Sequence, residues 1–263
     1  MRPYFFVLIV LAACQNQVDA PLVRAVYPTS NVLPENLLRM YVQFSRPMKM
    51  IGNIEKIKLT DEFGTEVSNV FFNNAKELWN REQTQLTLIL DPSRVKTGLI
   101  ANEVLGYIIK PNMNYTLIIE GLEDVYHQKM VTSFQKHISV EKADVTIPET
   151  KNWKLAIPKV NSRKSFEVSF LEILDYNSLK QRLIITDNEN HPIEGVVSIK
   201  KQETQWSFQP KYHWKPGEYM LCVNTRLEDP SGNNLNGLFD HKIGSLRYKQ
   251  EGVVERIRFT LKQ

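Results

Sequence analysis

The side chains best suited to ligand binding gather in one loop between two predicted strands. Pro210 and Pro216 bound this loop, and Tyr212 and Trp214 lie within it. Tyrosine and tryptophan present a large apolar ring with a polar tip, which suits stacking against a sugar ring. Tyr212 and Trp214 are therefore candidate ligand-binding residues for a glycan. Packing of the same rings over the end of a β-domain is the competing and commoner interpretation.

A second group of reactive side chains is acidic. Glu228 and Asp229 are adjacent and Asp240 follows shortly after, so the three carboxylates fit either a calcium site or a pair of catalytic acids. Residues 229–233 (Asp-Pro-Ser-Gly-Asn) are also a dense turn signal, in which Asp and Asn side chains bond to nearby backbone N–H groups and Gly takes a positive φ. Turn formation is the commoner role, and it is our prediction here.

The sequence lacks the motifs that would mark an enzyme. It contains no Gly-rich phosphate loop, no His-Glu-x-x-His and no Gly-x-Ser-x-Gly. Its histidines are not spaced as metal ligands with one another, with cysteine or with a carboxylate; they are His127, His137, His191, His213 and His241. We therefore predict a protein that is not an enzyme, with no catalytic residues, no metal and no cofactor.

The two cysteines have different surroundings. Cys222 lies inside a predicted strand, where a lone cysteine is usually a small buried apolar residue. Cys14 follows Arg2 and an apolar run over residues 4–13, which is too short to span a bilayer as a helix. The run ends in Leu11-Ala12-Ala13-Cys14. These features are typical of a leader segment rather than of the folded protein.

This N-terminus resembles a bacterial lipoprotein signal peptide. The resemblance implies a signal peptide at residues 1–13, cleavage before Cys14, lipid (palmitate among it) on that cysteine, and a tether over residues 14–21. The membrane would then be a partner, because several acyl chains anchor a protein stably. Gln15 after the lipidated cysteine implies the outer membrane, and we expect the periplasmic face. An ordinary secretory leader with a coincidental cysteine is the alternative.

Composition excludes other classes of protein. The chain has 263 residues, of which 42% are hydrophobic and 24% charged, as in a soluble globular protein. The formal charge of +4 is small, and the basic residues are interspersed with acidic ones. A nucleic-acid-binding surface usually concentrates Lys and Arg on one face. We therefore predict no nucleic-acid partner.

The rest of the chain reads as short strands separated by turns. Alternation of apolar and polar residues is clear over residues 39–45, 56–61, 115–120, 219–224 and 256–261. The alternation is interrupted over residues 92–112. There, a short helix around residues 100–105 and a long ordered loop are both compatible with the sequence. Turn signals every few residues between short strands favour a β-sandwich.

The strand pattern occurs twice. Val42-x-Phe44 recurs as Val168-x-Phe170, and Leu59-Thr60-Asp61 recurs as Ile185-Thr186-Asp187, both at a spacing of 126 residues. The polar segment around residue 148 separates the copies. We predict an all-β chain of two domains, residues 22–145 and 150–263, that meet end to end with limited play.

Both units resemble bacterial immunoglobulin-like domains of the kind found in S-layer and tandem surface proteins. The resemblance rests on the repeated Val-x-Phe strand, on the strand ending in Thr-Asp, and on the run Gly-Glu-Tyr-Met-Leu-Cys-Val at residues 217–223, followed by Asp-Pro-Ser-Gly-Asn at residues 229–233. The first unit has Asp124-Val125-Tyr126-His127 at the last position and lacks the Gly-Asn. The resemblance implies tandem antiparallel Ig-like β-sandwiches with a spacer, adhesion or binding role.

Three hypotheses about function follow. The first is a non-enzymatic envelope lipoprotein that acts as a structural or protein-binding module. The second is a glycan-binding or adhesive surface lipoprotein that uses Tyr212 and Trp214. The third is an envelope enzyme whose site lies at the domain junction, and it lacks a recognisable nucleophile–base pair.

Overall fold

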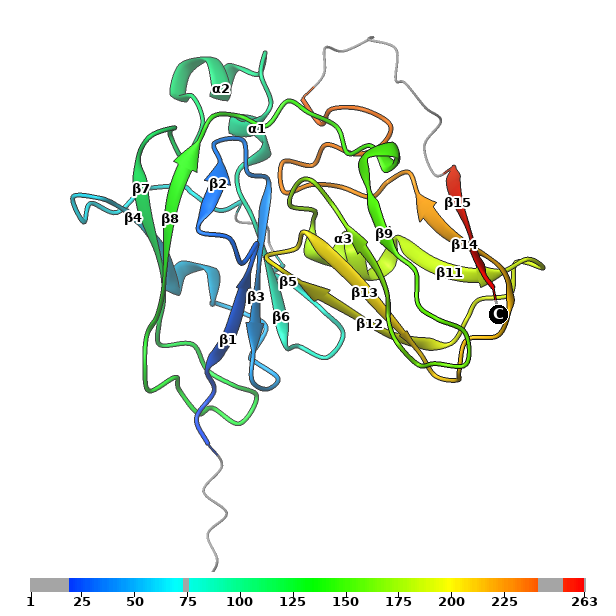
Figure 1. Ribbon diagram of the computed structural model, residues 1–263. Helices are drawn as coiled ribbons and strands as arrows, with labels where there is room; N and C mark the ends of the chain where they lie inside the picture. The colour runs from blue at the N-terminus through cyan, green and yellow to red at the C-terminus, as the bar shows by residue number, and fades with distance from the viewer. Residues whose placement is uncertain (1–18, 73–75, 241–252, 263) are drawn as a thin grey trace, which may run out of the picture.

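The computed structural model describes residues 19–72, 76–240 and 253–262. Cys14 and the signal peptide predicted at residues 1–13 lie outside these residues, so both the signal peptide and lipid attachment stay predictions. The described residues are mostly β-strands, which confirms the all-β fold (Figure 1). None of the helices in the described part of the chain is long and apolar enough to cross a membrane.

Two sheets form the N-terminal half, residues 19–145. One sheet has the order β1-β3-β6-β5 and the other the order β2-β8-β7-β4. The strands of the first are β1 (Val23–Tyr27), β3 (Arg39–Phe44), β6 (Gln85–Ile89) and β5 (Leu78–Trp79). Those of the second are β2 (Val32–Pro34), β8 (Phe134–Glu141), β7 (Asn114–Ile119) and β4 (Ile57–Asp61). The pairing of β2 with β8 is parallel, and the other pairings in this half are antiparallel.

The C-terminal half, residues 150–262, repeats this plan with one strand fewer among the described residues. Its sheets have the orders β12-β13-β10-β9 and β11-β14-β15. The first contains β12 (Gly195–Lys200), β13 (Gln205–Pro210), β10 (Phe166–Ser169) and β9 (Lys154–Ala156). The second contains β11 (Leu183–Asp187), β14 (Gly217–Asn224) and β15 (Val254–Leu261). All its strand pairs are antiparallel.

The structure bears out the repeat that the sequence predicts. Val42 and Phe44 lie on β3, which pairs with β1 and β6, and Val168 lies on β10, which pairs with β9 and β13. The Thr60-Asp61 and Thr186-Asp187 pairs end β4 and β11, whose partners β7 and β14 also correspond. Among the described residues, no pairing between named strands crosses from one half to the other. The boundaries of two independently folding domains stay a prediction.

Each half has a core of its own between its two sheets. Val42 and Leu86 of one sheet and Leu59 and Leu117 of the other are fully buried in the N-terminal core. The C-terminal core collects aromatic side chains, with the ring of Phe166 stacked on that of Phe259 at 4.4 Å between centroids. Burial of this apolar surface is the main force that holds each pair of sheets together.

The helices are short and lie in the connections. They are α1 (Pro92–Val95), α2 (Ile100–Leu105), α3 (Tyr176–Gln181) and the 3-10 turns η1 (Ile54–Lys56) and η2 (Thr150–Asn152). The helix at α2 settles the sequence alternative in favour of a helix at residues 100–105. The sequence did not predict α1 or α3. Asp175 accepts a hydrogen bond from the Ser178 backbone N–H at 2.7 Å and so caps the N-terminus of α3.

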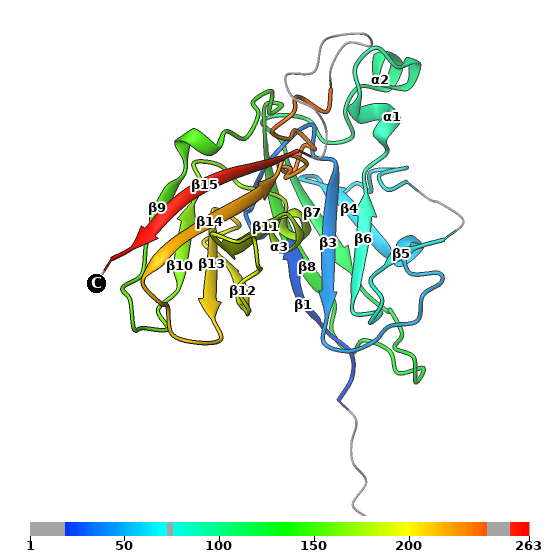
Figure 2. The same ribbon diagram turned by 90° about the vertical axis from the view of Figure 1, so that its right-hand side faces the viewer.

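The two halves lie side by side rather than end to end. Figures 1 and 2 show the sheet of β1 and β3 facing the C-terminal half, with α3 between the two halves. The chain leads from residue 19 into β1 at one end of the N-terminal half, and α1 and α2 lie at the other end. The expectation of an end-to-end arrangement is therefore wrong, because the polar face of β3 is covered by the other half: Tyr41 is only 4% exposed.

Candidate functional site

Trp214 is a core residue, which corrects its prediction as a ligand-binding residue. Its ring is 2% exposed and packs edge-on against Tyr219 at 5.3 Å, with Phe208 and Phe259 on other sides. Its indole N–H donates to the Lys164 carbonyl at 2.8 Å. A tryptophan held in this way covers the end of the core and offers no free face for a sugar. The competing packing interpretation holds for Trp214.

Tyr212, the other predicted binding residue, is exposed. Its side chain is 68% exposed, and the Lys211 ammonium lies 5.3 Å from the ring centroid. Lys211 also forms an ion pair of 2.7 Å with Glu194. Tyr212 and His213 line an open depression of about 540 Å³ between the β11–β12 and β13–β14 connections. An exposed ring beside charged groups at a depression is compatible with glycan stacking, so Tyr212 stays a candidate.

The structure separates the three acidic residues that the sequence placed together. Glu228 pairs with Arg39 of the N-terminal half at 2.6 Å. Asp240 accepts hydrogen bonds from the backbone N–H and the hydroxyl of Thr97. Asp229 turns into its own loop. These three carboxylates therefore do not form one site.

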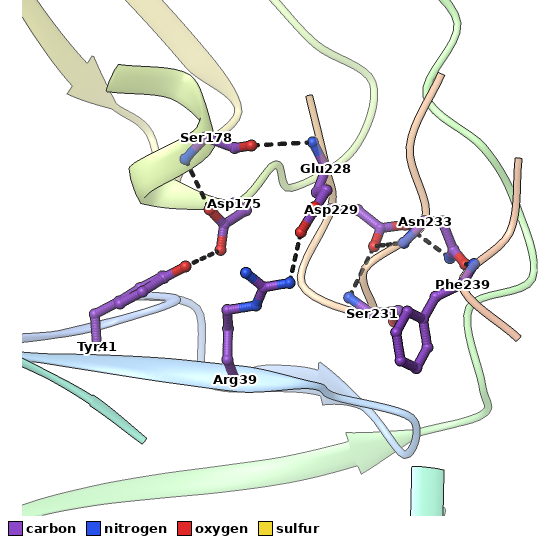
Figure 3. Close-up of polar contacts among 9 residues, drawn as sticks. All are labelled: Arg39, Tyr41, Asp175, Ser178, Glu228, Asp229, Ser231, Asn233 and Phe239. Carbon is purple, nitrogen blue, oxygen red and sulfur yellow. Dashed lines mark hydrogen bonds and ion pairs between the residues drawn. The ribbon is translucent and has the colours of Figure 1, made fainter. Parts of the chain in front are cut away.

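Asp229 organises the turn that the sequence predicts. Its carboxylate accepts hydrogen bonds from the Ser231 and Asn233 backbone N–H groups at 2.8 and 3.0 Å, and from the Asn233 side-chain amide at 2.9 Å (Figure 3). Gly232 has φ +81°, a conformation that favours glycine. The predicted turn roles of Asp229, Gly232 and Asn233 are confirmed.

Asp229 also belongs to a group of carboxyl groups that sequence reasoning missed. Asp144 of the connecting segment and Glu172 of the β10–α3 connection lie beside it, with one carboxylate oxygen of each of the three within 4.8 Å of the others. Burial and the charges of Asp144 and Glu149 raise the pKa of Glu172 to about 7. Burial and the charge of Asp144 also raise the pKa of Asp229 well above its usual value.

The bonding of these carboxyl groups favours a structural role. Carboxylate oxygens are ligands that Ca²⁺ accepts, and it takes six to eight oxygen ligands in all, with backbone carbonyls and waters among them. Asp229 already accepts three N–H bonds, and one oxygen of Asp144 accepts the backbone N–H and hydroxyl of Thr146. The Oε2 atom of Glu172 is buried without a hydrogen-bond partner. Several oxygens of the cluster are thus already engaged within the protein, and a proton held among the three carboxyl groups would relieve their mutual repulsion.

Next to this cluster, two strong polar contacts join the halves. The Tyr41 hydroxyl donates to the Asp175 carboxylate at 2.7 Å, and Arg39 donates to Glu228 at 2.6 Å (Figure 3). Both contacts connect β3 to α3 and to the turn after β14. Burial raises the pKa of Asp175 and of Glu228, while the Arg39 guanidinium opposes that rise in both. Burial also raises the pKa of the Tyr41 hydroxyl, so this group stays a proton donor.

Backbone contacts add to the same junction. The Leu38 N–H donates to the Pro230 carbonyl at 2.9 Å, and the Ser231 hydroxyl donates to the Asn36 side chain at 3.0 Å. On the other side of α3, the Glu203 carboxylate accepts the Thr29 N–H at 2.7 Å. The bond to the Glu203 carboxylate is charge-assisted, and such bonds are stronger than those between neutral groups.

Sequence reasoning could not have found these pairs. The partners of the Tyr41–Asp175 and Arg39–Glu228 contacts are 134 and 189 positions apart. The one local signal is the Asp175-x-x-Ser178 spacing, which is typical of a helix N-cap. That signal would have placed α3 but not its partner strand.

Comparisons with known proteins leave the family open. No protein-family model matches the chain, and no curated protein matches it. Among solved structures, the N-terminal part of the bacterial S-layer protein SbsC aligns over 93% of this chain and 44% of its own, with 10% identity and a TM-score of 0.31. The chain thus spans less than half of that structure.

Two further structures are similar at the same level. Native alpha-2-macroglobulin from Escherichia coli, spanning domains MG0-NIE-MG1, aligns over 93% of this chain and 72% of its own, with 11% identity and a TM-score of 0.30. The Bacteroides ovatus mixed-linkage glucan utilization locus protein SGBP-B, solved with a mixed-linkage heptasaccharide, aligns over 78% and 44%, with 14% identity and a TM-score of 0.21. Likenesses of this size assign no function to the chain.

Proposed function

We propose that this protein is a non-enzymatic bacterial envelope lipoprotein whose two β-sandwich halves act as one structural or protein-binding module. In this proposal lipid on Cys14 holds it at the outer membrane, facing the periplasm. The observation that carries the proposal is the junction, where Arg39, Tyr41, Asp175 and Glu228 are engaged with one another. Because these polar side chains bond to one another across the junction, they hold the two halves in one relative arrangement and are not presented to a substrate.

A second candidate function is glycan binding. It rests on Tyr212 alone, which is exposed beside Lys211 at an open depression. An enzyme with its site at the junction is the third candidate. The raised pKa of Glu172 suits an acid catalyst. However, the cavity of about 600 Å³ next to the connecting segment is lined by residues 145, 147–151, 235 and 238, and not by the three carboxyl groups.

Lipid attachment is tested first. Cys14→Ser should leave the precursor unprocessed or release the protein from the membrane fraction. Cys222→Ser is the matched control, since Cys222 is 5% exposed inside β14 and should leave processing unchanged. Unchanged membrane fractionation of Cys14→Ser would rule out the anchor.

Binding is tested by capture of partners from the native envelope with the lipidated protein. We expect a specific protein partner that Tyr212→Ala still recovers. Loss of a captured glycan in Tyr212→Ala, but not in Phe63→Ala, would favour the second candidate, because Phe63 is an equally exposed ring at a turn of the other half (80% against 68%). Turnover of an envelope substrate that Glu172→Gln abolishes would overturn the non-enzymatic proposal.

A further inference from the structure

One end of the N-terminal half carries exposed apolar side chains that its own core does not use. Ile51 is 81% exposed, Val131 83% and Tyr126 72%, and Met50 and Leu22 are each nearly half exposed. Single exposed apolar residues are common on soluble proteins, but several gathered at one end of a molecule are candidates for an interaction surface. We call this group the anchor-end surface.

These side chains lie on three neighbouring segments. The Ser45 N–H donates to the Leu22 carbonyl at 2.9 Å, which places the loop after β3 beside the start of β1. The Lys49 N–H donates to the Glu123 carbonyl at 3.0 Å, and the Val125 N–H to the Pro47 carbonyl at 3.3 Å. The loop after β7 is thereby fixed to the loop after β3. Figures 1 and 2 show these loops at the end of the molecule where the chain enters β1.

The loop after β7 is held in a defined shape. Asp124 is fully buried and accepts the backbone N–H groups of Tyr126 and Gln128, both at 2.9 Å. Arg46 lies 3.5 Å from the same carboxylate. Tyr126 of the anchor-end surface is therefore presented on a braced turn, as a preorganised contact surface needs.

The position of the tether says what covers this surface. Asp19 is the first described residue, and Cys14 lies five positions before it. Five residues reach at most about 18 Å even when fully extended. A lipid on Cys14 therefore keeps this end of the molecule close to the surface of the bilayer that holds the lipid.

We propose that the anchor-end surface docks on that bilayer, with Ile51, Tyr126 and Val131 in its interfacial region. This inference rests on the proposed lipid attachment. The partner is the lipid surface itself. Docking would fix the direction in which the rigid pair of halves projects, with α1 and α2 at the end away from the membrane.

The contact is apolar rather than electrostatic. Across residues 45–56 and 120–131, acidic and basic side chains are equal in number, with His uncharged. Glu123 lies 3.5 Å from the Lys49 ammonium and 3.9 Å from that of Lys129. No surplus charge is left to attract anionic headgroups, so docking should be insensitive to salt and to the charge of the lipid.

The chain offers a matched control at the opposite end. Val104 on α2 is 73% exposed, against 83% for Val131. The strand directions separate the two positions: β3 and β6 are antiparallel, α1 and α2 follow the end of β6, and the loop of Ile51 follows the end of β3. An apolar side chain of the same type is thus available far from the tether.

The test uses the lipidated protein in zwitterionic vesicles. Single variants Val131→Cys and Val104→Cys are labelled with the environment-sensitive dye NBD, since Cys222 is buried and Cys14 carries lipid. We expect the emission of the label at position 131 to shift to the blue and rise at both low and high salt, and that of the label at position 104 to stay unchanged. Flotation of the protein with the vesicles is measured in the same sample. It shows, independently of the dye, whether the lipid on Cys14 anchors the protein.

Adding Ile51→Asp to Val131→Cys should abolish the blue shift without loss of flotation. Adding Val104→Asp to Val131→Cys should leave the shift intact. Flotation without a blue shift at position 131, or an equal shift at position 104, would overturn docking while leaving the lipid anchor standing. Failure of the unmodified protein to float would overturn the anchor, and with it the docking.

Discussion

At the scale of single residues, Glu172 is one of the carboxyl groups through which the junction responds to pH. Its Oε2 atom is buried without a partner, and the carboxyl groups of Asp144 and Asp229 lie beside it. Carboxyl groups this close cannot all ionise freely in a buried site. The pKa of Glu172 in the folded protein is therefore raised to about 7, and its carboxyl group stays largely protonated at pH values below that.

The first prediction concerns Glu172→Gln. Between the ordinary pKa of 4.5 and the folded value of about 7, the folded state binds more protons than the unfolded state. The free energy of unfolding should therefore fall as pH rises through this window and level off above it. Glutamine does not ionise, so the variant should lose the part of this decline that Glu172 contributes and be more stable than the wild type above neutral pH, in urea titrations at several pH values.

Glu189→Gln is the matched control, because Glu189 is exposed in the turn after β11. Its stability profile should run parallel to that of the wild type. A parallel profile for Glu172→Gln would contradict the assignment of the pH response to Glu172.

Trp214 illustrates the limit of residue types as evidence. A tryptophan between prolines in a loop is suited both to a sugar-binding face and to the end of a core. The core position of Trp214 is decided by its hydrogen bond to the Lys164 carbonyl and its contacts with three aromatic rings, which the sequence does not show. Trp206, by contrast, alternates with Phe208 in the sequence, which is typical of a strand with one face in the core, and both side chains are buried. Where apolar residues alternate along a strand, the alternation therefore predicts which side chains are buried.

At the scale of elements, the same Asp-centred turn occurs in both halves. Asp124 accepts the N–H groups two and four positions later, and so does Asp229. The residue three positions after the aspartate has a positive φ in each case, +63° for His127 and +81° for Gly232. The sequence of the first unit lacks Gly-Asn, but the aspartate alone forms the turn.

The second prediction compares these equivalent positions. Gly232→Ala should lower the free energy of unfolding by about 1–2 kcal/mol from the left-handed backbone alone. The added methyl would also lie 2.8 Å from the Leu38 side chain of the other half. His127→Gly should instead leave stability unchanged or raise it by about 1 kcal/mol, because glycine relieves the same strain. Chemical denaturation of both variants checks the pair, and equal effects at both positions would contradict it.

Strands were more predictable than their environment. The alternation over β3, β4 and β14 predicted that these strands exist. The spacing of 126 residues between the two copies of the Val-x-Phe and Thr-Asp motifs predicted the repeat. It could not predict that the polar face of β3 is covered, because Arg39 and Tyr41 look like solvent-facing residues until the other half is present. The helix α3 was missed for a related reason, since its buried face is formed by contacts distant in the chain.

At the scale of the whole molecule, the junction makes one body of two similar units. Rings stack across it, with Tyr27 and Tyr176 at 3.6 Å between centroids, and side chains bond across it on both sides of α3. Contacts between chain-adjacent domains are often small and permit motion. The hydrogen bond of Tyr41 to the buried Asp175 and the partly buried Arg39–Glu228 ion pair favour a fixed arrangement of the halves.

The last prediction is that both halves unfold together. Trp79 lies in the N-terminal half, and Trp153, Trp206 and Trp214 lie in the C-terminal half. In the wild type, tryptophan fluorescence and far-ultraviolet circular dichroism should therefore give coincident urea transitions. The two transitions should coincide because of the bonds at the junction, where a hydrogen bond to a charged group contributes about 1.5–3 kcal/mol to stability.

The double variant Arg39→Met, Tyr41→Phe removes both side-chain bonds while keeping the size of the buried groups. It should separate the two transitions, because each half then unfolds with its own stability. Arg258→Met, which removes an exposed pair with Glu218 at 3.9 Å, should change stability by less than about 1 kcal/mol and keep the transitions coincident. Coincident transitions in the double variant would show that these two bonds do not couple the halves. Separate transitions in the wild type would show that the halves are independent domains joined by a passive contact.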